Sequence, residues 1–220
     1  MINLNLGDCM EAMSKMEDNA YDLAIVDPPY GSSADALKKE FDNSNKRAAK
    51  RKFYHHFENT PPNKDYFKQL YRVSRNCIVW GGNFFGLKGG VVAWNKNGTA
   101  FGEGEIALCT THASVKFFEH TWNGMLQQDM KNKEHRIHPT QKPVALYKWL
   151  LHNYAKEGDK ILDTHGGSMS IAIACHDMNF DLDLWELDPE YYQKGVERFN
   201  QHKAQLRMFE YLCAMRSLRQ

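Results

Sequence analysis

Residues 23–31 read Leu-Ala-Ile-Val-Asp-Pro-Pro-Tyr-Gly, a short apolar run followed by a stiff polar turn. A run this apolar and β-branched is typical of a strand buried in a parallel sheet. Asp27 then falls at the carboxyl end of that strand, where open α/β sheets bind their ligands. The stretch therefore predicts an α/β fold with a candidate site at Asp27.

Residues 27–30 carry groups that suit an exocyclic amine. Asp27 offers a carboxylate, while Pro28 and Pro29 have no N–H, fix φ and present bare carbonyls from a stiff loop. A carboxylate and a fixed carbonyl can accept both hydrogens of such an amine, and the ring of Tyr30 can stack on a base. The plainer interpretation is a Pro-Pro turn after a core strand.

A second segment, residues 160–175, reads Lys-Ile-Leu-Asp-Thr-His-Gly-Gly-Ser-Met-Ser-Ile-Ala-Ile-Ala-Cys. It predicts a strand that ends in Asp163, a glycine-containing turn, and a helix that starts near Ser168. Glycine lets the backbone approach a ligand closely, and the N–H groups at a helix start attract negative charge. A purely structural strand-to-helix turn uses glycine too, so this segment gains its value from its pairing with residues 27–30.

The pair of segments resembles the motifs of DNA amino-methyltransferases, which act on N6 of adenine or N4 of cytosine. Residues 27–30 are similar to their Asp-Pro-Pro-Tyr motif, and residues 163–170 to their S-adenosylmethionine loop. The amine-holding motif comes first here, as in the β group, whose sheet is a circular permutation of the common methyltransferase sheet. The resemblance implies one Rossmann-like α/β domain over residues 1–220, mostly parallel with one antiparallel strand.

The resemblance also implies the site residues. The catalytic residues would be Asp27, Pro28, Pro29 and Tyr30. Those expected to bind S-adenosylmethionine are Asp8, Cys9, Asp27, His138, Thr140, Lys142, Asp163, His165, Gly166, Gly167, Ser168 and Glu186. Residues 138–146 nearly repeat a family run that opens the helix before the cofactor strand. Thr164, His165 and Met169 depart from the family pattern. Met169 adds bulk where the family has glycine, so the affinity for the cofactor is the property that this departure would affect.

Read from the residues alone, Asp8 has a structural alternative. It ends an alternating strand-like stretch and could equally be a turn or cap residue. Glu186 ends a strand about 20 residues after the glycine loop, the place of a ribose-binding acid in nucleotide-binding folds. Asp188 is expected to cap the next helix, with Pro189 at its first position. Because that helix precedes the first strand in the unpermuted order, the two termini are expected to lie close together.

Further elements follow from apolar periodicity and capping signals. Asn63 should cap a helix through about residue 74, with Tyr66, Phe67, Leu70 and Tyr71 as its buried stripe. Strands are expected at 76–80, 91–94 and 104–109, and helices at 143–156 and from 189 to about 218. The apolar stripe Leu206, Phe209, Leu212 and Cys213 is either a homodimer contact or packing on the protein's own sheet.

Bulk properties exclude several classes. A formal net charge of +1 is far from that of a passive nucleic-acid binder, so DNA contacts must come from a local patch. Five scattered cysteines without a C-x-x-C pair indicate reduced thiols and a cytoplasmic (bacterial or phage-like) or nuclear setting. His135 and His138 lack an accompanying ligand cluster, so no metal is expected. We identify no signal peptide and no membrane span.

Two segments are candidates for nucleic-acid contact. The polar insertion 32–62 carries five positive charges within residues 46–52, namely Lys46, Arg47, Lys50, Arg51 and Lys52. These charges suit phosphates of duplex or single-stranded DNA; a solvated loop or a targeting signal are the alternatives. Residues 111–137 form a short expected recognition segment, with Lys116, Trp122, Lys131, Lys133 and Arg136.

The expected activity is methyl transfer from S-adenosylmethionine to N6 of a flipped-out adenine in DNA, which needs no covalent enzyme intermediate. Asp rather than Ser at position 27 favours adenine in the family pattern. Three alternatives stay open: cytosine N4 in DNA, adenine in RNA, and a degenerate subunit that binds nucleic acid for a catalytic partner.

Overall fold

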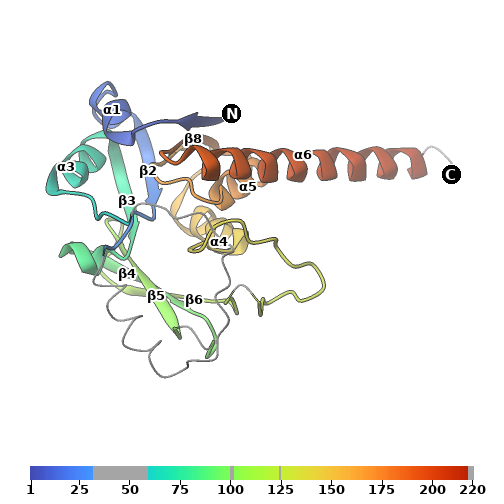
Figure 1. Cartoon of the computed structure of the whole chain (residues 1–220), viewed down its shortest axis with the longest axis horizontal. Helices are drawn as coiled ribbons and strands as arrows, with labels where there is room; N and C mark the ends of the chain where they lie inside the picture. The colour runs from blue at the N-terminus through green and yellow to red at the C-terminus, as the bar shows by residue number, and fades with distance from the viewer. Residues whose placement is uncertain (32–58, 100–101, 124, 218–220) are drawn as a thin grey trace.

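The computed structural model describes residues 1–31, 59–99, 102–123 and 125–217, with side chains as far as residue 205. These residues form an eight-stranded sheet flanked by helices (Figure 1). The strands are β1 (Ile2–Leu6), β2 (Tyr21–Val26), β3 (Ser74–Trp80), β4 (Gly90–Asn95), β5 (Gly104–Cys109), β6 (Val115–Glu119), β7 (Lys160–Asp163) and β8 (Asp181–Glu186). The helices are α1 (Cys9–Ser14), α3 (Lys64–Val73), α4 (Val144–Tyr154), α5 (Ser170–Asp177) and α6 (Pro189–Ser217), with a 3-10 turn η1 (Gly82–Phe85).

The strands lie in the order β1-β8-β7-β2-β3-β5-β4-β6. Among these described strands, only β5 runs antiparallel to its neighbours, β3 and β4, which confirms the expected mostly parallel sheet with one antiparallel strand. From β7 the chain passes through α5 to β8 on one side, and from β2 through α3 to β3 on the other. The strand order therefore reverses between β7 and β2, the place where open α/β sheets bind ligands.

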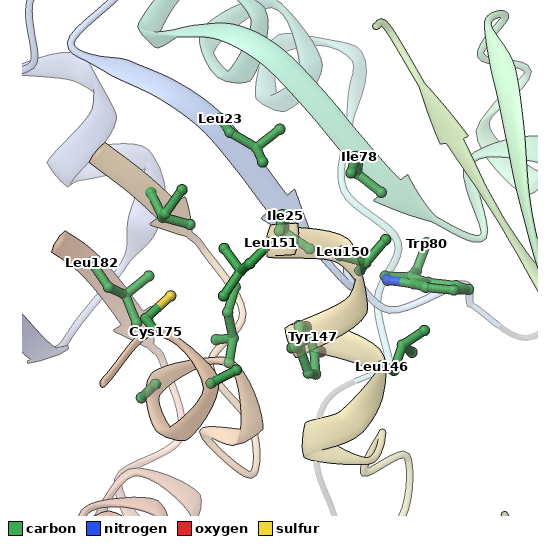
Figure 2. Close-up of a cluster of buried hydrophobic side chains, with 14 of the residues drawn as sticks. Leu23, Ile25, Ile78, Trp80, Leu146, Tyr147, Leu150, Leu151, Cys175 and Leu182 are labelled. Atoms are coloured by element: carbon green, nitrogen blue, oxygen red, sulfur yellow. The ribbon is translucent and has the colours of Figure 1, made fainter. Parts of the chain in front are cut away.

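The two faces of the sheet carry separate apolar cores. Alternate residues of β2 point to opposite faces, as a strand requires. Leu23 and Ile25 pack with α4 and α5, whereas Ala24 and Val26 pack with α1 and α3. Figure 2 shows the first of these cores, with α4 lying over β2 and β3; its labelled side chains are Leu23, Ile25, Ile78, Trp80, Leu146, Tyr147, Leu150, Leu151, Cys175 and Leu182.

Most expected elements are present within a residue or two. The side chain of Asn63 accepts hydrogen bonds from the backbone N–H groups of Asp65 (2.9 Å) and Tyr66 (3.1 Å), which confirms it as the cap of α3. Its buried face was only partly predicted, because Tyr71 is 40% exposed and Val73 is buried instead. Tyr71 follows Leu70 directly and is therefore rotated by about 100° from it around the helix, out of the apolar stripe.

The expectation that the two termini lie close together is wrong, although its premise holds. β1 pairs with β8, and the hydroxyl of Tyr192 at the start of α6 donates to the carbonyl of Leu4 (3.1 Å). However, α6 continues for 29 residues to Ser217 and so carries the chain away from β1 (Figure 1). At 1.5 Å per residue, this helix is roughly 43 Å long.

Several expectations fall outside the described residues or side chains. They are the basic run 46–52 and the apolar stripe of residues 206, 209, 212 and 213. The described cysteines, Cys9, Cys77, Cys109 and Cys175, are all free thiols. Within the described part of the chain, none of the helices has the length and apolarity needed to cross a membrane.

Candidate active site

Four carboxylates lie at the carboxyl ends of four adjacent parallel strands. Asp8 follows β1, Glu186 ends β8, Asp163 ends β7 and Asp27 follows β2. Neighbouring strands are about 5 Å apart, so these side chains form a row along one edge of the sheet. The structure thus brings together the two segments on which the sequence interpretation depends, at the point where the strand order reverses.

Both oxygens of the Asp27 carboxylate are engaged. The hydroxyl of Tyr30 donates to Oδ1 (2.6 Å), and the ammonium of Lys142 contacts Oδ2 (2.6 Å). A carboxylate oxygen has two lone pairs, so each can still accept another hydrogen bond. Among the described residues, none donates a hydrogen bond to the carbonyl of Pro28. The turn therefore presents a fixed carboxylate next to a carbonyl that can accept a hydrogen.

The ring of Tyr30 is held by the turn that follows β3. It stacks on Phe84, with ring centroids 5.1 Å apart and planes 23° apart. It also packs against the backbone of Gly81, where any Cβ would overlap the ring. Burial, and then the charges of Asp27 and Glu105, raise the pKa of Tyr30 well above its ordinary value, so its hydroxyl stays a donor. Phe84 remains 48% exposed and leaves an aromatic surface beside the motif.

Lys142 links Asp27 to the antiparallel strand. Its side chain is 3% exposed, and its Nζ also lies 3.0 Å from Glu105 on β5. Glu105 in turn pairs with Lys96, which follows β4. Sequence reasoning missed both Glu105 and Lys96. The available signal was an acidic residue inside the otherwise apolar run 104–109, but no pattern placed it opposite Asp27.

The loop after β7 is built around Asp163 and His165. Asp163 is 3% exposed and accepts the backbone N–H of His165 (2.9 Å). Burial, and the nearby charges of Asp27 and Glu186, raise the pKa of Asp163 to about 8. The ring of His165 packs edge-on against Tyr66 (5.4 Å), and burial lowers the pKa of His165 to about 4, so it is neutral near pH 7.

Met169 occupies the position where the family pattern has glycine, with a left-handed backbone (φ 56°). Its side chain is fully buried and lies against α6, where a Cβ on Gly195 would come within 2.8 Å of its Cγ. The bulk of Met169 thus points into the core beneath the loop. Glycine at position 195 makes room for it, a compensation that no local sequence pattern indicates.

Glu186 fixes the glycine loop to β8. Its two oxygens accept the backbone N–H groups of Gly167 (2.6 Å) and Asp188 (2.8 Å). Burial raises the pKa of Glu186, and these hydrogen bonds oppose the rise. Gly166 lies so close to Leu184 that a side chain would overlap it. Ser168 is buried, and its hydroxyl is within 3.1 Å of the Ser170 hydroxyl.

The remaining expected cofactor residues lie on either side of this loop. The ring of His138 packs against Tyr191 (4.3 Å) and lies about 3.7 Å from the position of a Cβ on Gly167. The Thr140 hydroxyl contacts His138 Nδ1 (3.0 Å). Asp8 is the N-cap of α1, where it accepts the N–H of Met10 (2.7 Å), so its structural alternative is realised. Burial raises the pKa of the neighbouring Cys9 to about 12.

In the segment 111–137, Trp122 and Arg136 are engaged within the protein, whereas Lys116, Lys131 and Lys133 are exposed. Trp122 is 4% exposed, and its indole N–H donates to the carbonyl of Gln141 (2.9 Å), so it anchors the segment rather than facing solvent. Arg136 contacts the carbonyls of Asn123 and Pro139.

One group of described side chains has the composition of a metal site: His176, Asp177 and His202. Asp177 accepts from His202 (2.7 Å), and its other oxygen contacts the ammonium of Lys148 (2.6 Å). Because a cation already occupies this carboxylate, we interpret the group as an ion-pair network that ties α4 and α5 to α6.

Comparisons with known proteins agree with this geometry. Residues 93–197 match the family model N6_N4_Mtase, described as DNA methylase. The chain is 35% identical over 69 residues to the type II methyltransferase M.HpaI of Haemophilus parainfluenzae, a match that spans 31% of this chain and 22% of M.HpaI.

Solved structures match over most of the chain. The M1.HpyAVI complex with S-adenosylmethionine has a TM-score of 0.56 and 17% identity, covering 90% of this chain and 100% of that one. The cytosine-N4-specific PvuII DNA methyltransferase has a TM-score of 0.58 and 12% identity, covering 90% and 86%. At these identities the likeness shows the fold. The family match over residues 93–197 and the motifs at the sheet edge make this chain similar to the N6/N4 DNA methylases.

Proposed function

We propose that this protein transfers a methyl group from S-adenosylmethionine to an exocyclic amine of a DNA base, and that the base is adenine, modified at N6. The observation that carries the proposal is the Asp27–Tyr30 turn at the strand-order reversal, with the Asp27 carboxylate fixed beside the Pro28 carbonyl.

The turn supplies what a poorly nucleophilic amine needs. The lone pair of adenine N6 is shared with the ring, and it becomes available when the nitrogen turns pyramidal. Asp27 and the Pro28 carbonyl can each accept one amine hydrogen and hold that geometry. Positioning of this kind contributes up to roughly 7–11 kcal/mol to lowering a barrier. The amine nitrogen forms its new bond to carbon and gives up one proton, which passes to water.

The residues around the glycine loop fit the cofactor. S-adenosylmethionine supplies a methyl group bonded to a positively charged sulfur, and transfer leaves the bonding electron pair on sulfur. Asp163 is a buried carboxylate whose raised pKa falls when a cation lies beside it. Glu186 retains lone pairs for ribose hydroxyls, and the side of Gly167 that carries no Cβ lies against the ring of His138. We propose that Asp8, Cys9, Thr140, His165, Gly166 and Ser168 complete this pocket.

The target base must leave the duplex to reach Asp27, at a cost of a few kcal/mol. Stacking on an aromatic ring returns roughly 1–3 kcal/mol per base. Tyr30 lies directly at the amine site, and the exposed ring of Phe84 extends the aromatic surface. The basic run 46–52 adds positive charge for the DNA backbone, and we propose that it contributes to binding.

The proposal is tested by methyl transfer from labelled S-adenosylmethionine to unmethylated duplex DNA, matched single strands and matched RNA. Wild type should label DNA, and Asp27→Ala should not. Asp65→Asn is the matched control, since this exposed carboxylate on α3 pairs with Lys68 (2.7 Å) and not with any of the four acids at the sheet edge. It should retain wild-type activity.

Other outcomes separate the alternatives. Label confined to RNA would replace DNA by RNA as the substrate. Label in DNA that persists in Asp27→Ala would remove Asp27 from the mechanism. No label in any nucleic acid, with a folded protein, would favour the degenerate-subunit alternative.

A further inference from the structure

Four charged side chains alternate in sign along a short chain that ends at Asp27. The Lys142 ammonium contacts Asp27 (2.6 Å) and Glu105 (3.0 Å), and Glu105 also pairs with Lys96. The members come from distant parts of the sequence: the turn after β2, the residues before α4, strand β5 and the end of β4. The net charge of the four is zero, so the chain is internally compensated.

Because Lys142 is buried, its ammonium must be paired with a carboxylate. Lys142 is 4% exposed, and a buried ammonium is strongly unfavourable unless it is paired and hydrogen-bonded. Burial alone would lower the pKa of Lys142, but the carboxylates of Asp27 and Glu105 outweigh it and raise that pKa above its ordinary value. Burial alone would raise the pKa of Glu105, but Lys142 and Lys96 hold it at about 2. Lys142 and Glu105 therefore both stay charged near pH 7.

The directions of the Lys142 contacts leave little for another ligand. An ammonium has three N–H donors. Two point at the carboxylates of Asp27 and Glu105, and the nitrogen also lies over the ring of Trp80, 5.2 Å from its centroid. Such a contact with an aromatic face is itself attractive. Lys142 is thus committed to the Asp27 side of the site, although the sequence interpretation placed it with the cofactor residues.

We propose that Lys142, anchored by Glu105, is a positioning residue that holds the Asp27 carboxylate toward the target amine. The proposal rests on the proposed methyl transfer and assigns a separate role to each of the four charged residues. Asp27 touches the amine, Lys142 fixes Asp27, and Glu105 with Lys96 fixes Lys142. The antiparallel strand β5 thereby takes part in the site through a residue that never reaches the substrate.

Removal of the ammonium should leave two carboxylates close together without a cation between them. In Lys142→Met the carboxylates of Asp27 and Glu105 lie within about 6 Å of each other, because both contact the same nitrogen in the wild type. Without the ammonium the two carboxylates repel each other, so Asp27 turns away from the position in which it can accept the amine hydrogens. The kcat for methyl transfer should therefore fall.

The decisive variants are Lys142→Met, Glu105→Gln and the double variant, with Lys148→Met as the matched control for loss of an ammonium in the same helical region. Steady-state methyl transfer is measured at pH 7. We expect Lys142→Met to lower kcat at pH 7 by about 10- to 100-fold, the size of effect that misplacement of a reacting group produces. The KM for S-adenosylmethionine should stay within about threefold, since no cofactor contact is lost.

The double variant separates positioning from simple structural damage. It removes the repulsion between the two carboxylates, so kcat at pH 7 should rise above that of Lys142→Met. A purely structural role would make the double variant equal or worse. Glu105→Gln keeps the Lys142–Asp27 pair and should lose about 3- to 10-fold in kcat, as a looser support would. An increase in KM for S-adenosylmethionine at unchanged kcat would return Lys142 to the cofactor pocket and overturn the proposal.

Unfolding measurements make the test independent of activity. Asp27→Asn, Lys142→Met and their double variant are compared by urea denaturation, and coupled residues give non-additive effects. Additive effects would overturn the proposal even if the enzyme is active. Strong coupling in a protein that methylates no nucleic acid would instead show that the ion chain stands and that the proposed function fails.

Discussion

Replacement of Asp163 by asparagine tests the electrostatics of the loop that follows β7. The change keeps the size of the side chain, and an amide oxygen can still accept the backbone N–H of His165, which lies at 2.9 Å. What it removes is an ionisable group that is 3% exposed and whose pKa is raised by burial to about 8. The variant therefore isolates the cost of this buried carboxyl.

The sign follows from proton linkage. In the folded protein Asp163 holds its proton up to about pH 8, whereas in the unfolded chain it loses it near its ordinary pKa of 3.8. The folded state thus binds more protons between these values, and the contribution of Asp163 to stability falls as pH rises through this window. Each pH unit corresponds to about 1.4 kcal/mol, which gives an upper bound of about 6 kcal/mol and, with relaxation around the site, roughly 2–4 kcal/mol.

The assay is urea denaturation of wild type and Asp163→Asn between pH 4 and pH 9. The two proteins should be nearly equal at pH 4, and the variant should become progressively more stable than wild type up to pH 8, after which the difference should level off. The difference between the proteins cancels the titration of His138 and His165, which both share. A difference that does not change with pH, or a variant that is less stable at pH 8, would refute the reasoning.

Two glycines give further predictions. Gly81→Ala should destabilise the protein by about 2–3 kcal/mol and lower methyl transfer, because its Cβ overlaps the ring of Tyr30; thermal unfolding measures this against Gly86→Ala, which has a similar φ of 66° and open space around it and should lose only about 1 kcal/mol. Gly195→Ala should cost about 1–2 kcal/mol instead of the usual gain in a helix, because its Cβ meets Met169 Cγ at 2.8 Å, and Met169→Ala in the same chain should reverse the sign. Equal melting temperatures of the Gly81 and Gly86 variants, or a stabilising Gly195→Ala alone, would contradict these two accounts.

Much of the fold could be predicted because local signals and tertiary structure agree. An apolar run that ends in an acid placed both Asp27 and Asp163 at strand ends, and a capping asparagine fixed the start of α3. The order of the motifs along the chain predicted the permuted sheet. These features depend on residues that are close in sequence or on the simple rule that parallel strands end at one edge.

The rest depends on contacts between distant residues. Nothing near Glu105 in the sequence indicates that it shares an ammonium with Asp27, since the three groups come from separate strands and a helix start. The orientation of the Met169 side chain could not be predicted either. It depends on the space left by Gly195, which lies on α6, and strand β8 separates that helix from α5 in the sequence. The predicted proximity of the two termini was wrong because strand order places only the start of α6 beside β1. The length of α6 then determines how far its other end lies from that strand.

The most direct test of the central claim is the identity of the methylated nucleoside in duplex DNA treated with wild-type protein and S-adenosylmethionine, read by mass spectrometry after digestion. We expect N6-methyladenine, formed by wild type and absent with Asp27→Ala. N4-methylcytosine would contradict the assignment of the base, but it would agree with the proposed binding of an exocyclic amine by Asp27 and the Pro28 carbonyl. The absence of any methylated nucleoside in DNA would contradict the proposed methyl transfer itself.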